Sequence, residues 1–216
     1  NSNEKIRIVT HHWSSNYLKG FDIYKQLDEL LITSEWGSKL EFTYIGNLSD
    51  DIIFKKTQVI PPLEEVQLAN ELKNHHIYIT ASRNEPSGNH HMEGAMVGLP
   101  ILYLKSGAIP EYCNGFGVEF TESTFLESLK IIINDHSIYA NNLKNYPYSF
   151  DHTFQQIMES INFLIKNRKK VIADRKKASR LTILLNYYLS NLRKIIHKRK
   201  IQFMKFGSYY KKRIFK

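Results

Sequence analysis

The sequence has 216 residues, of which 42% are hydrophobic and 12% aromatic, as expected of a folded domain with an appendage and not of a disordered chain. Its single cysteine, Cys113, excludes an intramolecular disulfide, and no apolar run is long enough for a membrane-spanning helix, so we expect a cytoplasmic protein. The net charge of +9 is unevenly distributed along the sequence. Residues 1–165 hold 12 of the 30 Lys and Arg and 20 of the 21 Asp and Glu, whereas residues 166–216 hold 18 Lys and Arg and one Asp.

Residues 1–165 are predicted to alternate strands and helices. Short runs rich in β-branched and aromatic residues predict strands at residues 5–10, 40–45, 57–60, 76–80, 100–104 and 118–120. Apolar residues at helical spacing predict helices at residues 21–32, 64–73, 89–97, 110–112, 125–133 and 151–170, the last with Asp151 near its N-cap. This alternation predicts an α/β, Rossmann-like domain of three layers, in which helices cover both faces of a parallel sheet.

The loops that follow the strands are expected to meet at one edge of this sheet, because right-handed crossovers bring the carboxyl ends of parallel strands together. Residues 10–20, 46–55, 81–89 and 104–110 would then line a single crevice. A ligand is expected to bind there.

The segment Glu85-Pro-Ser-Gly-Asn-His-His-Met-Glu93 is the strongest candidate for a site. It follows a predicted strand and enters a helix that we expect to start near Asn89, and a helix N-terminus offers unpaired N–H groups to phosphate or sugar oxygens. Gly88 lets the backbone approach a ligand without a Cβ in the way. Glu93, about one turn into the helix, is suited to a bidentate hold on a vicinal diol.

Several further motifs follow one another in a fixed order. They are Lys19-Gly20 after the first strand, a strand that ends at Gly46, two glutamates with seven residues between them, Glu93-Gly-Ala-Met followed by Gly98-Leu-Pro100, and the segments Gly107–Glu111 and Asn114–Gly117. Over about residues 5–165 this series resembles the group 1 family of retaining glycosyltransferases, which have the two-domain GT-B architecture. The resemblance implies that residues 1–165 are the C-terminal, donor-binding half of that architecture.

The resemblance also implies roles for the matching positions. Lys19 would neutralise the diphosphate of a nucleotide-diphosphate sugar, Glu85 would face the transferred sugar, and Glu93 would bind the ribose hydroxyls. Lys19 and Glu85 are thus the candidate catalytic residues. The candidate donor-binding residues are Lys19, Ser87, Gly88, Asn89, His90 and Glu93. No cofactor is implied beside this substrate.

One position departs from the family. The family usually has an Arg shortly before the Lys-Gly pair as a second phosphate clamp, and residues 11–18 contain none. Arg7 lies in a predicted strand and is a poor substitute, so Ser14 or His12 would help Lys19 instead. The adjacent histidines suggest a metal, but no set of Asp, His and Cys has ligand spacing, so no metal site is predicted.

Residues 166–216 are predicted to form a basic, amphipathic, helical tail. Clusters of Lys and Arg alternate with Leu, Ile, Phe and Tyr, a composition that favours an anionic membrane surface and a peripheral membrane location. Two alternatives stay open: nucleic acid, which is less favoured, and a solvated helix that packs on an absent partner domain.

Two functions are compatible with these features. The first is the donor-binding half of a retaining, hexosyltransferase-type glycosyltransferase, whose acceptor site lies on an N-terminal domain or partner chain that the sequence lacks. The second is a non-catalytic nucleotide-sugar-binding or targeting module that serves a separate catalytic subunit. The missing Arg and the missing half favour the second function over a self-sufficient enzyme.

Overall fold

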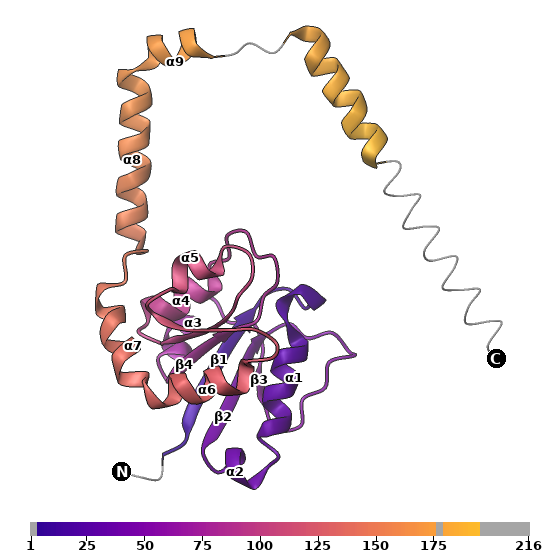
Figure 1. The fold of residues 1–216 in the computed structure, drawn as a ribbon, viewed down its shortest axis with the longest axis vertical. Coiled ribbons are helices and arrows are strands. Elements are labelled where there is room, and N and C mark those ends of the chain that lie inside the picture. Colours follow the sequence, from indigo (N-terminus) through magenta and orange to yellow (C-terminus); the bar gives the residue numbers. More distant parts are fainter. Residues whose placement is uncertain (1–3, 176–178, 195–216) are drawn as a thin grey trace, which may run out of the picture. The chain divides into compact units, whose positions relative to one another are not determined.

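The computed structural model describes residues 4–175 and 179–194, and its centre is a six-stranded sheet (Figure 1). All neighbouring strands are parallel, in the order β3-β2-β1-β4-β5-β6. The strands are β1 (Ile6–His12), β2 (Leu40–Gly46), β3 (Gln58–Ile60), β4 (Ile77–Thr80), β5 (Ile101–Leu104) and β6 (Gly117–Phe120). The parallel sheet predicted from the sequence is therefore confirmed.

The central strands are apolar on both faces because each face is covered by helices. Successive side chains of a strand point to opposite faces, so Ile8 of β1 joins one hydrophobic cluster and Val9 joins the other. The pair Ile79 and Tyr78 of β4 divides in the same way. The sheet is thus the middle of three layers, as predicted.

The helices that form the outer layers differ between the two clusters. Apolar side chains of α1 and α6 pack in the first cluster, and those of α3, α4 and α5 pack in the second. Two short helices and two 3-10 turns were not predicted, since none of them buries more than one side chain. The helices of this domain are α1 (Phe21–Leu30), α2 (Ser34–Gly37), α3 (Glu65–Leu72), α4 (His90–Met96), α5 (Ile109–Cys113), α6 (Phe125–Asn134) and α7 (His136–Asn142), and the 3-10 turns are η1 (Tyr17–Lys19) and η2 (Leu143–Asn145).

The chain changes direction across the sheet between β1 and β4. It runs outward from β1 through β2 to β3, and then returns to add β4, β5 and β6 on the other side of β1. In open α/β sheets, ligands bind at such a switch point, outside the carboxyl ends of the strands. The loops after β1 and β4, at residues 13–20 and 81–89, meet at this point.

One buried carboxylate ties the loop before β3 to helix α1. Asp28 is 2% exposed and accepts hydrogen bonds from the backbone N–H groups of Lys55, Lys56 and Thr57, at 2.7, 2.9 and 2.6 Å. The hydroxyl of Thr57 donates a fourth, at 2.6 Å. Three successive backbone amides in a segment without regular structure are satisfied by this single side chain.

The chain divides into two units, residues 1–156 and 157–216, whereas the boundary predicted from composition lies after residue 165. Helix α8 (Phe150–Lys166) crosses the division, so neither position ends a helix. The single helix predicted over 151–170 is wrong in its extent, because it breaks at Asn167 and continues as α9 (Arg168–Asp174). Asp151 lies in the first turn of α8, near the N-cap as predicted, and the hydroxyl of Ser149 caps the start by accepting from the N–H of His152 at 3.3 Å.

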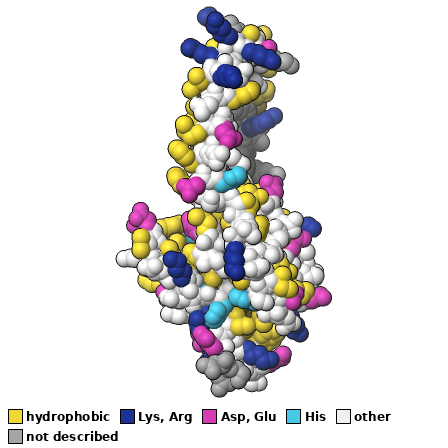
Figure 2. Space-filling view, turned by 90° about the vertical axis from the view of Figure 1, so that its left-hand side faces the viewer, with side chains coloured by type: hydrophobic (Ala, Val, Ile, Leu, Met, Phe, Trp, Pro, Cys, Tyr) yellow, Lys and Arg dark blue, Asp and Glu magenta, His cyan; other side chains and the backbone are white. Residues whose placement is uncertain are grey.

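Helices α8 and α9 are followed by a third helix at residues 180–194, and the rest of the predicted tail lies outside the described residues. Large hydrophobic side chains are exposed along α8 (Figure 2). No helix within the described ranges combines the length and hydropathy needed to cross a bilayer.

Candidate functional site at the carboxyl edge of the sheet

Lys19 is placed at the switch point by a short turn and a glycine. The side chain of Asn16 caps η1 by accepting from the N–H of Leu18 at 3.0 Å. Gly20 then ends η1 and starts α1 with a φ of +80°, and a Cβ at this position would overlap the backbone of Ala81 after β4. The absence of a side chain at Gly20 therefore brings Lys19 against the loop that carries Glu85.

Lys19 and Glu85 form an ion pair. The Nζ of Lys19 lies 2.9 Å from Oε2 of Glu85, and the two side chains are only 20% and 17% exposed. The two candidate catalytic residues, 66 positions apart in sequence, thus meet in the fold. The positive charge that was expected to face a diphosphate is partly neutralised by the carboxylate that was expected to face a sugar.

The backbone of Glu85 is held by the loop after β5. Its carbonyl accepts a hydrogen bond from the N–H of Ala108 at 2.9 Å. Gly107, with a φ of +59°, lies so close to Glu85 that a Cβ would overlap the Glu85 backbone. Gly88 is constrained less strictly, because a Cβ there would come within 2.8 Å of the Glu85 side chain, which could shift, and not of its backbone. These glycines serve the packing of Glu85 in addition to leaving room for a ligand.

Arg83 is a charged residue of the same loop that the sequence did not single out. Its guanidinium forms two hydrogen bonds with the carboxylate of Asp22, at 2.7 and 2.6 Å, and a third with Glu122 at 2.6 Å. These carboxylates raise the pKa of Arg83 above its ordinary value. Because both partners are acidic, Arg83 anchors the loop to α1 and does not replace the missing phosphate clamp.

Glu93, on α4, is paired with a histidine of β1. The Nε2 of His11 lies 2.7 Å from Oε2 of Glu93, and the Glu93 side chain is 45% exposed whereas that of His11 is buried. The hydrogen bond from His11 is the main reason that the pKa of Glu93 lies below its ordinary value. Glu93 is therefore a carboxylate with one oxygen held from within the domain.

The remaining histidines near the site are buried and neutral. His12 bonds the hydroxyl of Tyr24 at 2.8 Å, and burial, followed by the charge of Lys19, lowers its pKa well below its ordinary value. The expectation that His12 would help to bind phosphate stays a prediction, and neither its 4% exposure nor its bond with Tyr24 favours it. The ring of His90 bonds Thr80 at 2.8 Å, and burial lowers its pKa as well, so only its backbone stays available for the predicted role.

His91 lies between the two glutamates. Burial lowers its pKa to about 4, against the opposing effect of Glu85 and Glu93, so the ring is uncharged at neutral pH. Neither ring nitrogen has a hydrogen-bond partner among the described residues.

The segment between the glutamates is open to solvent. Ser87 and Asn89 are exposed, and the N–H groups of Gly88 and Asn89 donate no hydrogen bond to another described residue. The helix that follows starts at His90 and has only seven residues, so it is shorter than predicted. Its dipole contributes little, and the free N–H groups of this turn are the donors available to a ligand.

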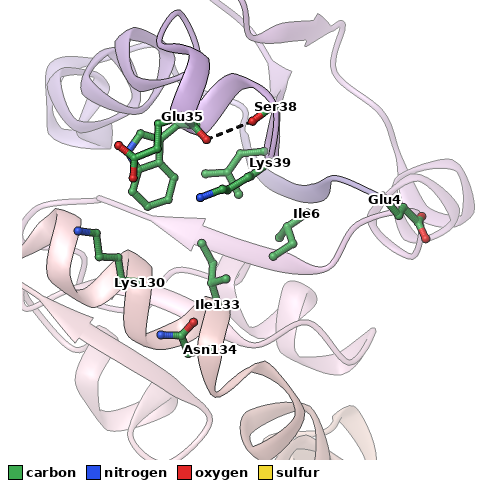
Figure 3. A pocket seen from close by; sticks show the side chains of 10 residues that line it. Glu4, Ile6, Glu35, Ser38, Lys39, Lys130, Ile133 and Asn134 are labelled. Atoms are coloured by element: carbon green, nitrogen blue, oxygen red, sulfur yellow. Dashed lines mark hydrogen bonds between the residues drawn. The ribbon is translucent and has the colours of Figure 1, made fainter. Parts of the chain in front are cut away.

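The sheet domain also has a hollow that is separate from the candidate site. A hollow of about 510 Å³ lies at the opposite edge of the sheet, between the α2 region and α6, where Glu35, Lys39 and Lys130 surround it (Figure 3). None of the candidate site residues lines this hollow.

Within residues 4–175 and 179–194, no group of three or more His, Cys, Asp and Glu is arranged to hold a metal ion.

Neither a protein-family model nor a curated protein matches the sequence. Among solved structures, the chain is similar to TarM, with a TM-score of 0.53 and 12% identity over 74% of this chain and 37% of TarM. It is also similar to the pneumococcal O-GlcNAc transferase GtfA, solved in complex with UDP and GlcNAc, with a TM-score of 0.57 and 16% identity over 80% of this chain and 37% of GtfA. The chain thus spans little more than a third of the length of either protein. Both are GT-B glycosyltransferases, so the resemblance found in the sequence is confirmed at the level of the fold: this chain has the Rossmann-like fold of one half of a GT-B enzyme.

Proposed function

We propose that this chain is the donor-binding half of a retaining glycosyltransferase that uses a nucleotide-diphosphate sugar. The observation that carries the proposal is a pair of contacts at the switch point of a GT-B-like half, in which Lys19 pairs with Glu85 and His11 pairs with Glu93. The UDP and GlcNAc in the GtfA structure support a nucleotide sugar as the ligand class.

Each residue has a proposed task that suits its surroundings. Lys19 binds the diphosphate and stabilises the charge that develops on it as the sugar leaves. The free N–H groups of Gly88 and Asn89 hold phosphate or sugar oxygens, Glu85 faces the transferred sugar, and Glu93 binds the ribose diol. A phosphate that reaches Lys19 has to compete with the carboxylate of Glu85, so donor binding exchanges one ion pair for another.

A second candidate is a non-catalytic module that binds the donor but leaves transfer to another chain. The observation that favours it is that no unpaired Lys or Arg stands beside Lys19 among the described residues of the site, since Lys19 is paired with Glu85 and Arg83 with two carboxylates. Both candidates require nucleotide-sugar binding, and they differ in turnover.

A calorimetric titration with UDP-, GDP- and ADP-sugars tests the shared part of the proposal. We expect one base to be preferred, with a Kd of roughly 1 mM or tighter, a range typical of enzyme substrates. Binding of none of them contradicts both candidates. A radiolabelled transfer assay, with the chain alone and with a candidate N-terminal partner, then separates them, because binding without transfer in either case leaves only the module.

We further propose that the reaction takes place beside an anionic membrane. The helix at residues 180–194 exposes eight large apolar side chains and carries its charges at its ends, on Arg180, Arg193 and Lys194. A helix with a broad apolar face and flanking cations fits the boundary between lipid headgroups and acyl chains. Helix α8 is less suited to this role, since Asp151 and Glu159 lie on it and Lys166 is its only Lys or Arg.

Sedimentation with vesicles tests this location. The full chain is expected to bind vesicles of phosphatidylserine and phosphatidylcholine and not phosphatidylcholine alone. Leu185→Asp should weaken binding on the order of tenfold or more, because it places a charge on the apolar face. Asn186→Asp, with the same added charge on a neighbouring polar residue, is the matched control and should have a smaller effect. Equal effects of the two substitutions, or no binding by the unmodified chain, would rule out this mode of attachment.

A further inference from the structure

Three residues from three elements form a continuous chain of hydrogen bonds that ends at Glu93. The hydroxyl of Tyr78, on β4, lies 3.1 Å from Nδ1 of His11, on β1. The Nε2 of His11 lies 2.7 Å from Oε2 of Glu93, on α4. Tyr78 is fully buried and His11 is 5% exposed, so the chain runs from the core to the partly exposed carboxylate.

The direction of the hydrogen bond to Glu93 follows from the chemistry of a carboxylate. A carboxylate can only accept, so Nε2 of His11 carries a hydrogen and donates it to Oε2 of Glu93. The other side of the imidazole is held by Tyr78, whose hydroxyl lies beside Nδ1 and also accepts from the backbone N–H of His11 at 3.3 Å.

The Tyr78 ring is itself fixed in place. Gly94 of α4 packs directly on it, and a Cβ at Gly94 would come within 2.5 Å of the ring. The ring of His11 meets that of Tyr78 edge to face, with centroids 5.6 Å apart, and meets His90 at 6.3 Å. The imidazole therefore has little freedom to turn.

We propose that His11 is a positioning residue for the ribose diol of the donor: it holds Oε2 of Glu93 so that Oε1 faces the ligand. No hydrogen bond to Oε1 is present among the described residues. An unrestrained glutamate that is nearly half exposed samples several rotamers, and holding one oxygen removes much of that entropy cost before the ligand arrives. The inference rests on the proposed function, since it concerns the same donor site.

The test measures two ligands against the same variants of the full chain. The first ligand is whichever of UDP, GDP and ADP binds the unmodified chain best, and the second is its 2′,3′-dideoxy counterpart, which lacks both ribose hydroxyls. His11→Ala is expected to weaken the ribonucleotide about tenfold and the dideoxynucleotide less than about twofold. Tyr78→Phe, which removes the hydroxyl beside Nδ1, should also weaken the ribonucleotide more than the dideoxynucleotide, with a smaller loss than His11→Ala.

Two comparisons separate positioning from a purely structural effect. His11→Gln keeps an N–H donor and is expected to recover part of the ribonucleotide affinity that Ala loses. In a double-mutant cycle, His11→Ala should add little to the loss caused by Glu93→Gln, because both act on one hydrogen bond. His75→Ala is the matched control, since His75 is also buried but bonds the carbonyl of Glu71.

The outcomes distinguish the inference from the proposed function. A loss that is equal for the two ligands, a Gln variant no better than Ala, or full additivity with Glu93→Gln would overturn the positioning role while nucleotide binding stands. If the unmodified chain binds none of the three nucleoside diphosphates, the proposed function fails and the inference fails with it. If His11→Ala does not fold, as judged by circular dichroism, Tyr78→Phe alone must show the selective loss.

Discussion

Lys19→Ala is expected to weaken the binding of a nucleoside diphosphate on the order of 10–100-fold, while leaving the affinity for the corresponding nucleoside nearly unchanged. Lys19 is the cation that η1 and Gly20 bring to the switch point, and its side chain is mostly buried. A charge-assisted hydrogen bond to phosphate is strong in such surroundings. Calorimetric titration of the diphosphate and the nucleoside against both proteins measures the difference.

Lys39→Ala provides the control for this prediction. It removes the same charge at the opposite edge of the sheet, beside the hollow between the α2 region and α6, and should leave both affinities unchanged. Glu85→Gln gives a second comparison, because it releases Lys19 from its ion pair and should strengthen diphosphate binding. A similar loss for Lys19→Ala and Lys39→Ala would mean that only the net charge of the chain matters.

Asp28→Asn is expected to lower the free energy of unfolding of the sheet domain by about 3 kcal/mol at pH 7. The carboxylate accepts four hydrogen bonds, and an amide at the same place would direct its own N–H groups toward some of these donors. Urea denaturation followed by tryptophan fluorescence measures the change. Trp13 and Trp36, the two tryptophans of the chain, both belong to this domain.

The effect of Asp28 depends on pH in a defined direction. Burial opposes its ionisation, but the hydrogen bonds from Thr57, Lys55 and Lys56 outweigh burial and hold its pKa below the ordinary value. The carboxylate therefore adds its full stability above the unfolded-state pKa of about 4, and that contribution disappears as the pH falls through the lower folded-state pKa. The difference between wild type and Asp28→Asn should narrow over this range. Asp50→Asn, on an exposed residue, is the control, and an equal effect at Asp50 would contradict the proposed role of Asp28.

The strands and main helices could be predicted because their sequences carry a strong pattern. Strands buried on both faces read as continuous apolar runs, and α1 and α6 each bury a regular stripe. Helix α7 (His136–Asn142) was missed because it buries none of its side chains and so has no apolar period. The break at Asn167 was missed for a related reason, since the exposed apolar residues continue past it.

The edge at which the site lies could also be predicted, but the pairing of its side chains could not. Lys19 and Glu85 were both expected at this edge, whereas their ion pair depends on rotamers that long-range packing selects. His11 and His12 show the limit clearly. Successive residues of β1 face opposite sides of the sheet, so one histidine meets Glu93 of α4 and the other meets Tyr24 of α1. The sequence did carry a signal for these contacts, namely two adjacent histidines at the end of the central strand β1.

The contacts among the loops at the carboxyl edge have a consequence for how a ligand would bind. The loop after β1 is joined to the loop after β4 by the bond from the N–H of Arg83 to the carbonyl of Leu18, at 2.7 Å. The loop after β4 is joined in turn to the loop after β5 by the bond between Ala108 and Glu85. Three loops that are separate in sequence are thus joined to one another by backbone hydrogen bonds. These bonds restrict the three loops before a ligand arrives, so less of the free energy of binding is spent on ordering them.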